Sequence, residues 1–258
     1  MATNPSVPFP SQPAPVSPES APLSEGQRLL DTFIAPRKTF NDLRLNASWW
    51  APFLILVVVS MLFVYVADQK VGFRKIAENQ IHMQPKQADR IDQMPAAQRE
   101  RVMQQQVTWT RIISYAFPVV ILLWLAIIAG VLLATLKFGA SADIRFMPLF
   151  ALVTYASLPG LLKSLLAIVS LVAGVSSDGF TFQNPVATNP GYFVDPAASP
   201  VLYSLLTKFD IFSLWTLVLT AIGITCISKV KTGTAFAVVF CWFAFVVLAG
   251  VGLSLAIS

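Results

Sequence analysis

Two ionisable side chains, Lys163 and Asp210, lie inside or at the start of apolar stretches of this 258-residue chain. A charged group at membrane depth is costly, so it usually faces the interior of a helical bundle, paired with another charge or a carbonyl. Asp210 is the one carboxylate that we expect at the depth of Lys163, so we predict that the two interact directly or through water. In the alternative, Lys163 extends toward lipid headgroups on its long stem, and Asp210 only caps or borders its helix.

Tyr155, Pro159 and Lys163 recur at intervals of four residues, which predicts one stripe along a single helix. We treat these three residues and Asp210 as a candidate polar core. Pro118 and Pro159 each free a backbone carbonyl, which either kinks a helix or lines a polar cavity. Kinks are the commoner result.

Other residues offer little further chemistry. The chain holds one histidine, His82, and two cysteines, each inside an apolar stretch. HExxH, GxSxG and Walker sequences are missing, as is a pair of intramembrane aspartates. General acid–base catalysis would have to rest on Tyr155, Lys163 or Asp210. We therefore expect a protein that is not an enzyme, with no catalytic or metal site and no cofactor.

The composition identifies the environment that must position these residues. Charged residues make up 12% of the chain and hydrophobic residues 55%, and the mean hydropathy is +0.67. Soluble proteins carry roughly 25% charged residues, so this composition indicates an integral membrane protein. The net charge of +5 comes mostly from basic residues that flank apolar segments. That arrangement favours contacts with anionic lipid headgroups over contacts with nucleic acid.

Five apolar stretches predict an all-α, polytopic bundle of five transmembrane helices over residues 49–258. A helix needs about 20 residues to cross about 30 Å of hydrocarbon. The predicted spans are about 49–67, 112–136, 146–175, 203–227 and 235–257. Pairs of small residues spaced by four predict close helix contacts in three of them. These pairs are Ala156 with Gly160, Ala126 with Gly130, and Gly252 with Ala256.

The segments outside the spans differ in character. Residues 1–23 contain seven prolines and predict a disordered tail, because such a tract cannot bury enough apolar surface to offset the entropy of ordering. Residues 68–111 are polar, and Pro85 and Pro95 divide them into helical pieces. Residues 176–199 predict an irregular loop.

Residues 24–48 predict an amphipathic helix that lies in the membrane interface. Ser24 and Gln27 have the spacing of a capping box, and the pattern breaks near Pro36. The alternative is a soluble helix packed on a partner. The residues expected to contact the membrane surface are Arg37, Lys38 and Arg44, which would bind lipid phosphates, and Trp49 and Trp50, which would anchor the first span.

Basic residues set the predicted orientation. With five spans, one face carries the N-terminus and the short connectors 137–145 and 228–233, and its basic residues lie close to span ends. The other face has nine basic residues against eight, but most of them lie in the long segment 68–111. Because residues near span ends weigh most, we predict a cytoplasmic N-terminus and an exterior C-terminus.

Several stretches resemble the Yip-type (Ypt/Rab-interacting protein) domain of membrane proteins. Residues 34–40 followed by residues 49–53 resemble the start of that domain in its bacterial members. Residues 155–159 resemble the Tyr-x-x-x-Pro element of its third span, and residues 209–215 resemble its fourth. The similarity covers roughly residues 28–257.

The resemblance implies a role in organising membranes. Eukaryotic members reside in Golgi and endoplasmic reticulum membranes, bind prenylated Rab-type GTPases and help to form vesicles or shape membranes. Their Asp-Leu-Tyr-Gly run is missing here; only Trp50 and Pro52 match that segment. We therefore expect a bacterial-type member in the cytoplasmic (inner) membrane, with a membrane-organising, trafficking-like or scaffolding role.

The expected partners are anionic lipid headgroups, with no nucleic acid. Other membrane proteins, a GTPase by resemblance, and a second copy of the chain are also open as partners. The alternative function is a small-solute or ion transporter, or a permease subunit, that uses the kinked helices and Lys163. A transporter should have a water-filled cavity that reaches Lys163.

Overall fold

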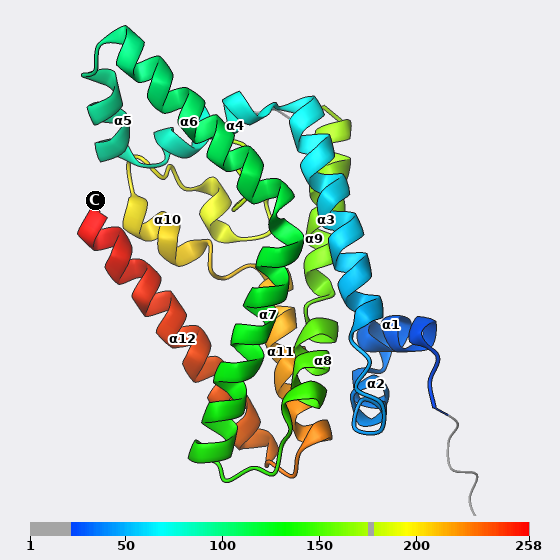
Figure 1. Ribbon diagram of the computed structural model, residues 1–258. Helices are drawn as coiled ribbons and strands as arrows, with labels where there is room; N and C mark the ends of the chain where they lie inside the picture. Colours follow the sequence, from blue (N-terminus) through cyan, green and yellow to red (C-terminus); the bar gives the residue numbers. More distant parts are fainter. Residues whose placement is uncertain (1–21, 175–177, 258) are drawn as a thin grey trace, which may run out of the picture.

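The computed structural model describes residues 22–174 and 178–257 and places them in helices and connecting loops, with no strand in those ranges (Figure 1). This confirms the predicted all-helical class. The predicted Pro-rich tail lies outside the described residues except for Pro22 and Leu23. The elements in chain order are α1 (Glu25–Ile34), α2 (Pro36–Asp42), α3 (Trp50–Lys70), α4 (Phe73–His82), α5 (Pro85–Asp92), α6 (Ala96–Tyr115), α7 (Phe117–Ala134), the π-helical turn η1 (Thr135–Gly139), α8 (Phe146–Ala156), α9 (Pro159–Val172), the 3-10 turn η2 (Pro190–Phe193), α10 (Pro200–Leu206), α11 (Ile211–Ile227) and α12 (Thr232–Ile257).

Four segments of the described chain are long and apolar enough to cross a membrane. Their bounds are Trp50–Lys70, Phe117–Gly139, Phe146–Val172 and Thr232–Leu255. The pair α10 and α11 passes the same test only when taken together, and it is bent by 44° at its break. The structure therefore has four spans, or five if this bent pair counts as one.

The helices run back and forth between two ends of the bundle (Figure 1). The α1–α2 hairpin and the connectors at 140–145 and 228–231 lie at the lower end of the view, which we call the hairpin end. Helices α4, α5, α6 and α10 and the C-terminus lie at the upper end, which we call the α6 end. The apolar helices α3, α7, α8–α9, α11 and α12 connect the two ends.

Prolines determine where several helices begin, because proline has no N–H to donate to the preceding turn and fits the first turn of a helix. Pro85 starts α5 and Pro95 immediately precedes α6, as the sequence predicted. Pro118 lies at the second position of α7. Helix α6 therefore continues through residues 112–115, and the second span starts at Phe117 and not near residue 112 as predicted.

Pro159 starts α9 two residues after α8 has ended, so the third span consists of two helices. Tyr155 lies in α8 and Lys163 in α9. Ser157 and Leu158 keep right-handed helical dihedrals across this break, and residues 146–172 remain one apolar segment. The single stripe through Tyr155, Pro159 and Lys163 stays a prediction.

Helix α8 is the centre of the bundle. Every side chain from Leu149 to Ala156 is buried, and α8 packs against α1, α3, α7 and α11. Half of the α8–α9 span is buried inside the protein, against 11% of the α12 span. Helix α12 packs on α10 and α11 at the periphery and is tied to η1 by a hydrogen bond from Trp242 Nε1 to Thr135 Oγ1 (3.0 Å).

A close approach between α8 and α11 involves a glycine that the pattern of small residues did not select. A Cβ added to Gly223 of α11 would lie 2.5 Å from Cδ1 of Leu152, whose side chain is fully buried in α8. At Gly130, Gly160 and Gly252 an added Cβ would meet nothing within 4 Å. The predicted close contacts at these three glycines are therefore absent, and the absence of a side chain at Gly223 is what lets α8 and α11 pack together.

Candidate functional site

The structure brings Lys163 and Asp210 together in an ion pair. Lys163 Nζ lies 2.9 Å from Asp210 Oδ2, with 21% of the lysine side chain and 2% of the aspartate side chain exposed. Lys163 comes from the first turns of α9, and Asp210 is the residue that precedes α11. The pair therefore joins the third span to the bent segment α10–α11.

The Asp210 carboxylate is also the N-cap of α11. Its Oδ1 accepts hydrogen bonds from the backbone N–H groups of Phe212 (3.0 Å) and Ser213 (3.2 Å). These N–H groups have no partner within the helix, and a carboxylate is the group best suited to satisfy them. The two alternatives considered for Asp210, pairing with Lys163 and capping its own helix, are thus both realised in one side chain.

Thr188 completes this cluster from a loop distant in sequence. Its hydroxyl donates a hydrogen bond to Asp210 Oδ2, and its carbonyl accepts one from the backbone N–H of Ile211 (3.1 Å). Thr188 was missed by sequence reasoning, because a threonine within a loop of mixed composition carries no periodic signal. We call Lys163, Thr188 and Asp210 the α9–α11 cluster.

Tyr155 belongs to a second cluster, on the other side of the Pro159 break. Its hydroxyl donates a hydrogen bond to Glu25 Oε2 (2.7 Å) in α1. Glu25 Oε1 lies 3.2 Å from Arg28 Nη1, and Arg28 Nη2 lies 2.5 Å from Asp42 Oδ2. Only 1% of the Arg28 side chain is exposed. We call Glu25, Arg28, Asp42 and Tyr155 the hairpin cluster.

The hairpin cluster fixes α1 to α2 and both helices to the bundle. The carbonyl of Arg28 accepts hydrogen bonds from the hydroxyls of Thr32 (2.7 Å) and Thr39 (3.1 Å), one on each helix. The predicted capping box of Ser24 and Gln27 is present at the start of α1. Residues 24–48 therefore form two helices that pack on the spans α8 and α11 of the same chain, with the break before Pro36 that the sequence predicted. Their place in the membrane interface stays a prediction.

Only part of the hairpin cluster can be recognised in the sequence. The spacing of three between Glu25 and Arg28 permits a pair on one helix face. Nothing near this pair in the sequence indicates Asp42 or Tyr155 as further members of the cluster. Each lies on another helix, which only the tertiary fold brings close.

The residues predicted to contact the membrane surface divide into two groups. Arg37, Lys38 and Arg44 are exposed, with Lys38 Nζ lying 2.9 Å from Asp31 Oδ2. Trp50 is 56% exposed. Trp49 is instead half-buried, and its ring packs edge-on against Phe53 and Phe150. Trp49 is thus part of the core, because the bend before α3 turns its ring toward α8.

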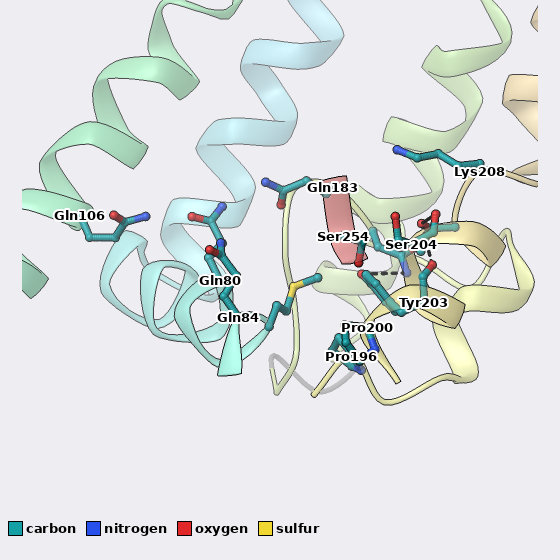
Figure 2. Close-up of a pocket in the computed structure, with 13 residues that line it drawn as sticks. Gln80, Gln84, Gln106, Gln183, Pro196, Pro200, Tyr203, Ser204, Lys208 and Ser254 are labelled. Atoms are coloured by element: carbon teal, nitrogen blue, oxygen red, sulfur yellow. Dashed lines mark hydrogen bonds between the residues drawn. The ribbon is translucent and has the colours of Figure 1, made fainter. Parts of the chain in front are cut away.

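A polar cavity of about 550 Å³ opens at the α6 end (Figure 2). Glutamine side chains reach it from one side, and Tyr203, Ser204, Lys208 and Ser254 from the other. The glutamines are Gln80, Gln84, Gln106 and Gln183. Amides and hydroxyls donate and accept hydrogen bonds, so this lining suits a polar ligand. Lys208 lines this cavity, whereas Lys163 lines none of the four cavities described in this structure.

Outside the spans, a salt bridge joins α4 to α6. Arg74 Nη2 lies 2.9 Å from Glu100 Oε2, and Arg74 Nε lies 3.3 Å from Glu78 Oε1. The hydrogen bonds from Arg74 lower the pKa of the Glu100 carboxyl from its usual value. This surface pair orients the α4–α6 segment above the spans.

Four segments long and apolar enough to cross a membrane, one of them paired through Lys163 with Asp210 at the start of α11, indicate a multi-pass helical membrane protein. Residues 30–253 match the Yip1 domain. The match covers most of the chain, so the protein belongs to the Yip1 domain family, in agreement with the resemblance seen in the sequence. No curated protein and no solved structure matches the chain.

We predict that replacing Lys163 by Met will destabilise the protein by about 3–5 kcal/mol, because Asp210 would remain buried without its opposite charge. The double variant Lys163→Met, Asp210→Asn should recover most of this loss, because Asn is also a good N-cap residue. Thermal unfolding of the purified protein in detergent measures the double-mutant cycle. Equal stabilities for the single and double variants would show that the ion pair has no structural role.

We predict that replacing Tyr155 by Phe will loosen the α1–α2 hairpin, because Glu25 loses a hydrogen bond to a charged acceptor that contributes about 1.5–3 kcal/mol. Limited proteolysis within residues 22–48 should become faster, while the spans stay protected. The matched control is Tyr65→Phe, an exposed tyrosine of α3. If both variants are cleaved at the wild-type rate, the hydrogen bond to Glu25 does not hold the hairpin.

Proposed function

We propose that this member of the Yip1 domain family is a non-enzymatic protein that organises the membrane or scaffolds other membrane proteins. The supporting observation is the use made of its intramembrane charges. Lys163 and Asp210 join α9 to α11, and Tyr155 joins α8 to the hairpin. These groups, which a catalyst or carrier would need to keep free for its ligand, are instead committed to joining helices.

The exposed apolar faces of the outer spans suit a scaffold. Only 22% of the span Phe117–Gly139 and 11% of the span Thr232–Leu255 are buried inside the protein. The remaining apolar side chains of α7 and α12 face lipid or neighbouring proteins. The proposed partners are anionic lipids, other membrane proteins, a GTPase as in the eukaryotic members, and a second copy of the chain.

We further propose that the bent pair α10–α11 crosses the membrane as one span. The five resulting spans place the hairpin at the cytoplasmic face and the C-terminus outside, in a bacterial inner membrane. The path of the chain in Figure 1 supports this arrangement, since the hairpin and the C-terminus lie at opposite ends of the bundle. The basic residues of both short connectors lie at the hairpin end, in keeping with the preference for positive charge on the cytoplasmic side.

Transport is a second candidate function, favoured by two observations. The break between α10 and α11 resembles the discontinuous helices of transporters, whose ends hold substrates. The polar cavity at the α6 end is lined by residues of α10. Against it stands the Asp210 carboxylate, which is occupied by Lys163, Thr188 and two backbone N–H groups.

Accessibility labelling separates the two functions. In a background without Cys226 and Cys241, we expect a cysteine in place of Lys163, combined with Asp210→Asn, to resist a membrane-impermeant maleimide. Lys208→Cys, which lines the polar cavity, is the positive control and should react. Ala167→Cys, fully buried in α9, is the negative control. Reaction at position 163 as fast as at position 208 would favour transport over a packed scaffold.

Reporter fusions test the proposed orientation. A fluorescent protein that matures only in the cytoplasm should be bright when fused at the N-terminus and dark at the C-terminus, while alkaline phosphatase should be active only at the C-terminus. A fusion inserted at residue 93, between α5 and α6, is the control and should behave like the C-terminus. Matching signals from both termini would contradict the five-span arrangement.

A further inference from the structure

A second cavity, of about 390 Å³, lies at the hairpin end where four apolar helices begin or end. Its walls come from the connector after α2, the connector before α8, the first turn of α8, and the residues that follow α11. They are Arg44, Leu45, Asp143, Ile144, Arg145, Pro148, Ile227, Ser228 and Lys229. The cavity is therefore built by three separate connectors that only the tertiary fold brings together.

The lining carries an excess of positive charge. Arg44, Arg145 and Lys229 face Asp143 alone, which leaves a formal charge of +2. Within the described part of the chain, none of the three cations forms an ion pair. Asp143 offsets one of these three like charges, and a further anion bound among them would relieve the repulsion that remains.

The start of α8 favours an anion, as the basic side chains do. Arg145 is the N-cap residue of α8, and no side chain caps this end of the helix. The backbone N–H groups in the first turn of a helix have no partner within it and favour an anion. The first turn of α8 reaches the cavity through Pro148, which itself has no N–H to donate. The carbonyl end of α11 opposes an anion here, but the Ser228 hydroxyl satisfies one of its carbonyls, that of Ile224 (2.6 Å).

The cavity lies at the level of the lipid headgroups. Helix α3 begins at Trp50, α8 begins at Phe146, α11 ends at Ile227 and α12 begins at Thr232. These span ends mark the edge of the hydrocarbon layer, so the adjoining connectors lie where lipid phosphates are found. The apolar lining residues Leu45 and Ile144 add a surface suited to the glycerol and upper acyl region of a lipid.

We propose that this cavity binds the phosphodiester of an anionic phospholipid headgroup. Arg44, Arg145 and Lys229 hold the phosphate oxygens by charge-assisted hydrogen bonds, as basic pockets between transmembrane helices do for acidic lipids. The site differs from the exposed cations Arg37 and Lys38, which do not line the cavity. It deepens the proposed function, on which it rests for anionic lipid as a partner, because it assigns that lipid to one cavity.

Native mass spectrometry of the full-length protein in detergent, titrated with short-chain phosphatidylglycerol or phosphatidylcholine, tests the site. The wild-type protein should bind phosphatidylglycerol at least about tenfold more tightly, because only this lipid brings net negative charge to the pocket. The variant Arg145→Gln, Lys229→Gln should lose about tenfold or more of that affinity, since two hydrogen bonds to a charged group are removed.

The matched control is Lys137→Gln, Lys231→Gln, which removes the same charge from exposed positions at the hairpin end without touching the cavity lining. It should bind phosphatidylglycerol within about twofold of wild type, because these side chains do not line the cavity and exposed charges are screened by salt. Equal losses in both double variants would overturn the proposal in favour of diffuse charge. Equal affinity of the wild type for the two lipids would also overturn it.

A soluble competitor identifies the source of the phosphate. Glycerol phosphate lacks acyl chains, so at millimolar concentration it should fail to displace bound phosphatidylglycerol. Complete displacement would show a site for a free phosphate compound and overturn the assignment to a lipid. Circular dichroism melting of each variant, expected to match the wild type because the substituted side chains are exposed, excludes misfolding as the cause of lost binding.

Discussion

A buried charge needs partners within the protein, and Asp210, whose side chain is 2% exposed, has four of them. The break between α10 and α11 leaves the first backbone N–H groups of α11 without a partner inside their own helix. The Asp210 carboxylate satisfies two of these groups, Lys163 neutralises its charge, and Thr188 brings the preceding loop to it. The bent segment, the start of α9 and the position of the loop thus depend on one side chain.

The hairpin follows the same rule at the other end of the bundle. Arg28 is fully buried, yet its guanidinium meets two carboxylates and its carbonyl meets two hydroxyls. A buried guanidinium without these partners would destabilise the fold by more than the packing around it stabilises it. Consequently α1 and α2 dock in one place, with Tyr155 fixing that place on the central helix.

Much of this architecture could be predicted from the sequence because it rests on local properties. Apolar length indicated the spans, the capping box indicated where α1 begins, and Pro85 and Pro95 divided the polar segment. The pairing of Lys163 with Asp210 followed from depth alone. Thr188, Asp42 and Gly223 could not be found in this way, since each acts on a residue that only tertiary packing brings near. The division of labour between Tyr155 and Lys163 was equally hidden, because their partners Glu25 and Asp210 come from different helices.

Because the chain is synthesised from its N-terminus, the members of the hairpin cluster become available at different times. Glu25, Arg28 and Asp42 are made first and can pair among themselves as soon as they emerge. Tyr155 is synthesised more than a hundred residues later, after two apolar helices have been threaded into the bilayer. Until then the hairpin lacks its partner on α8, so its docking on that helix must follow the arrival of the third span.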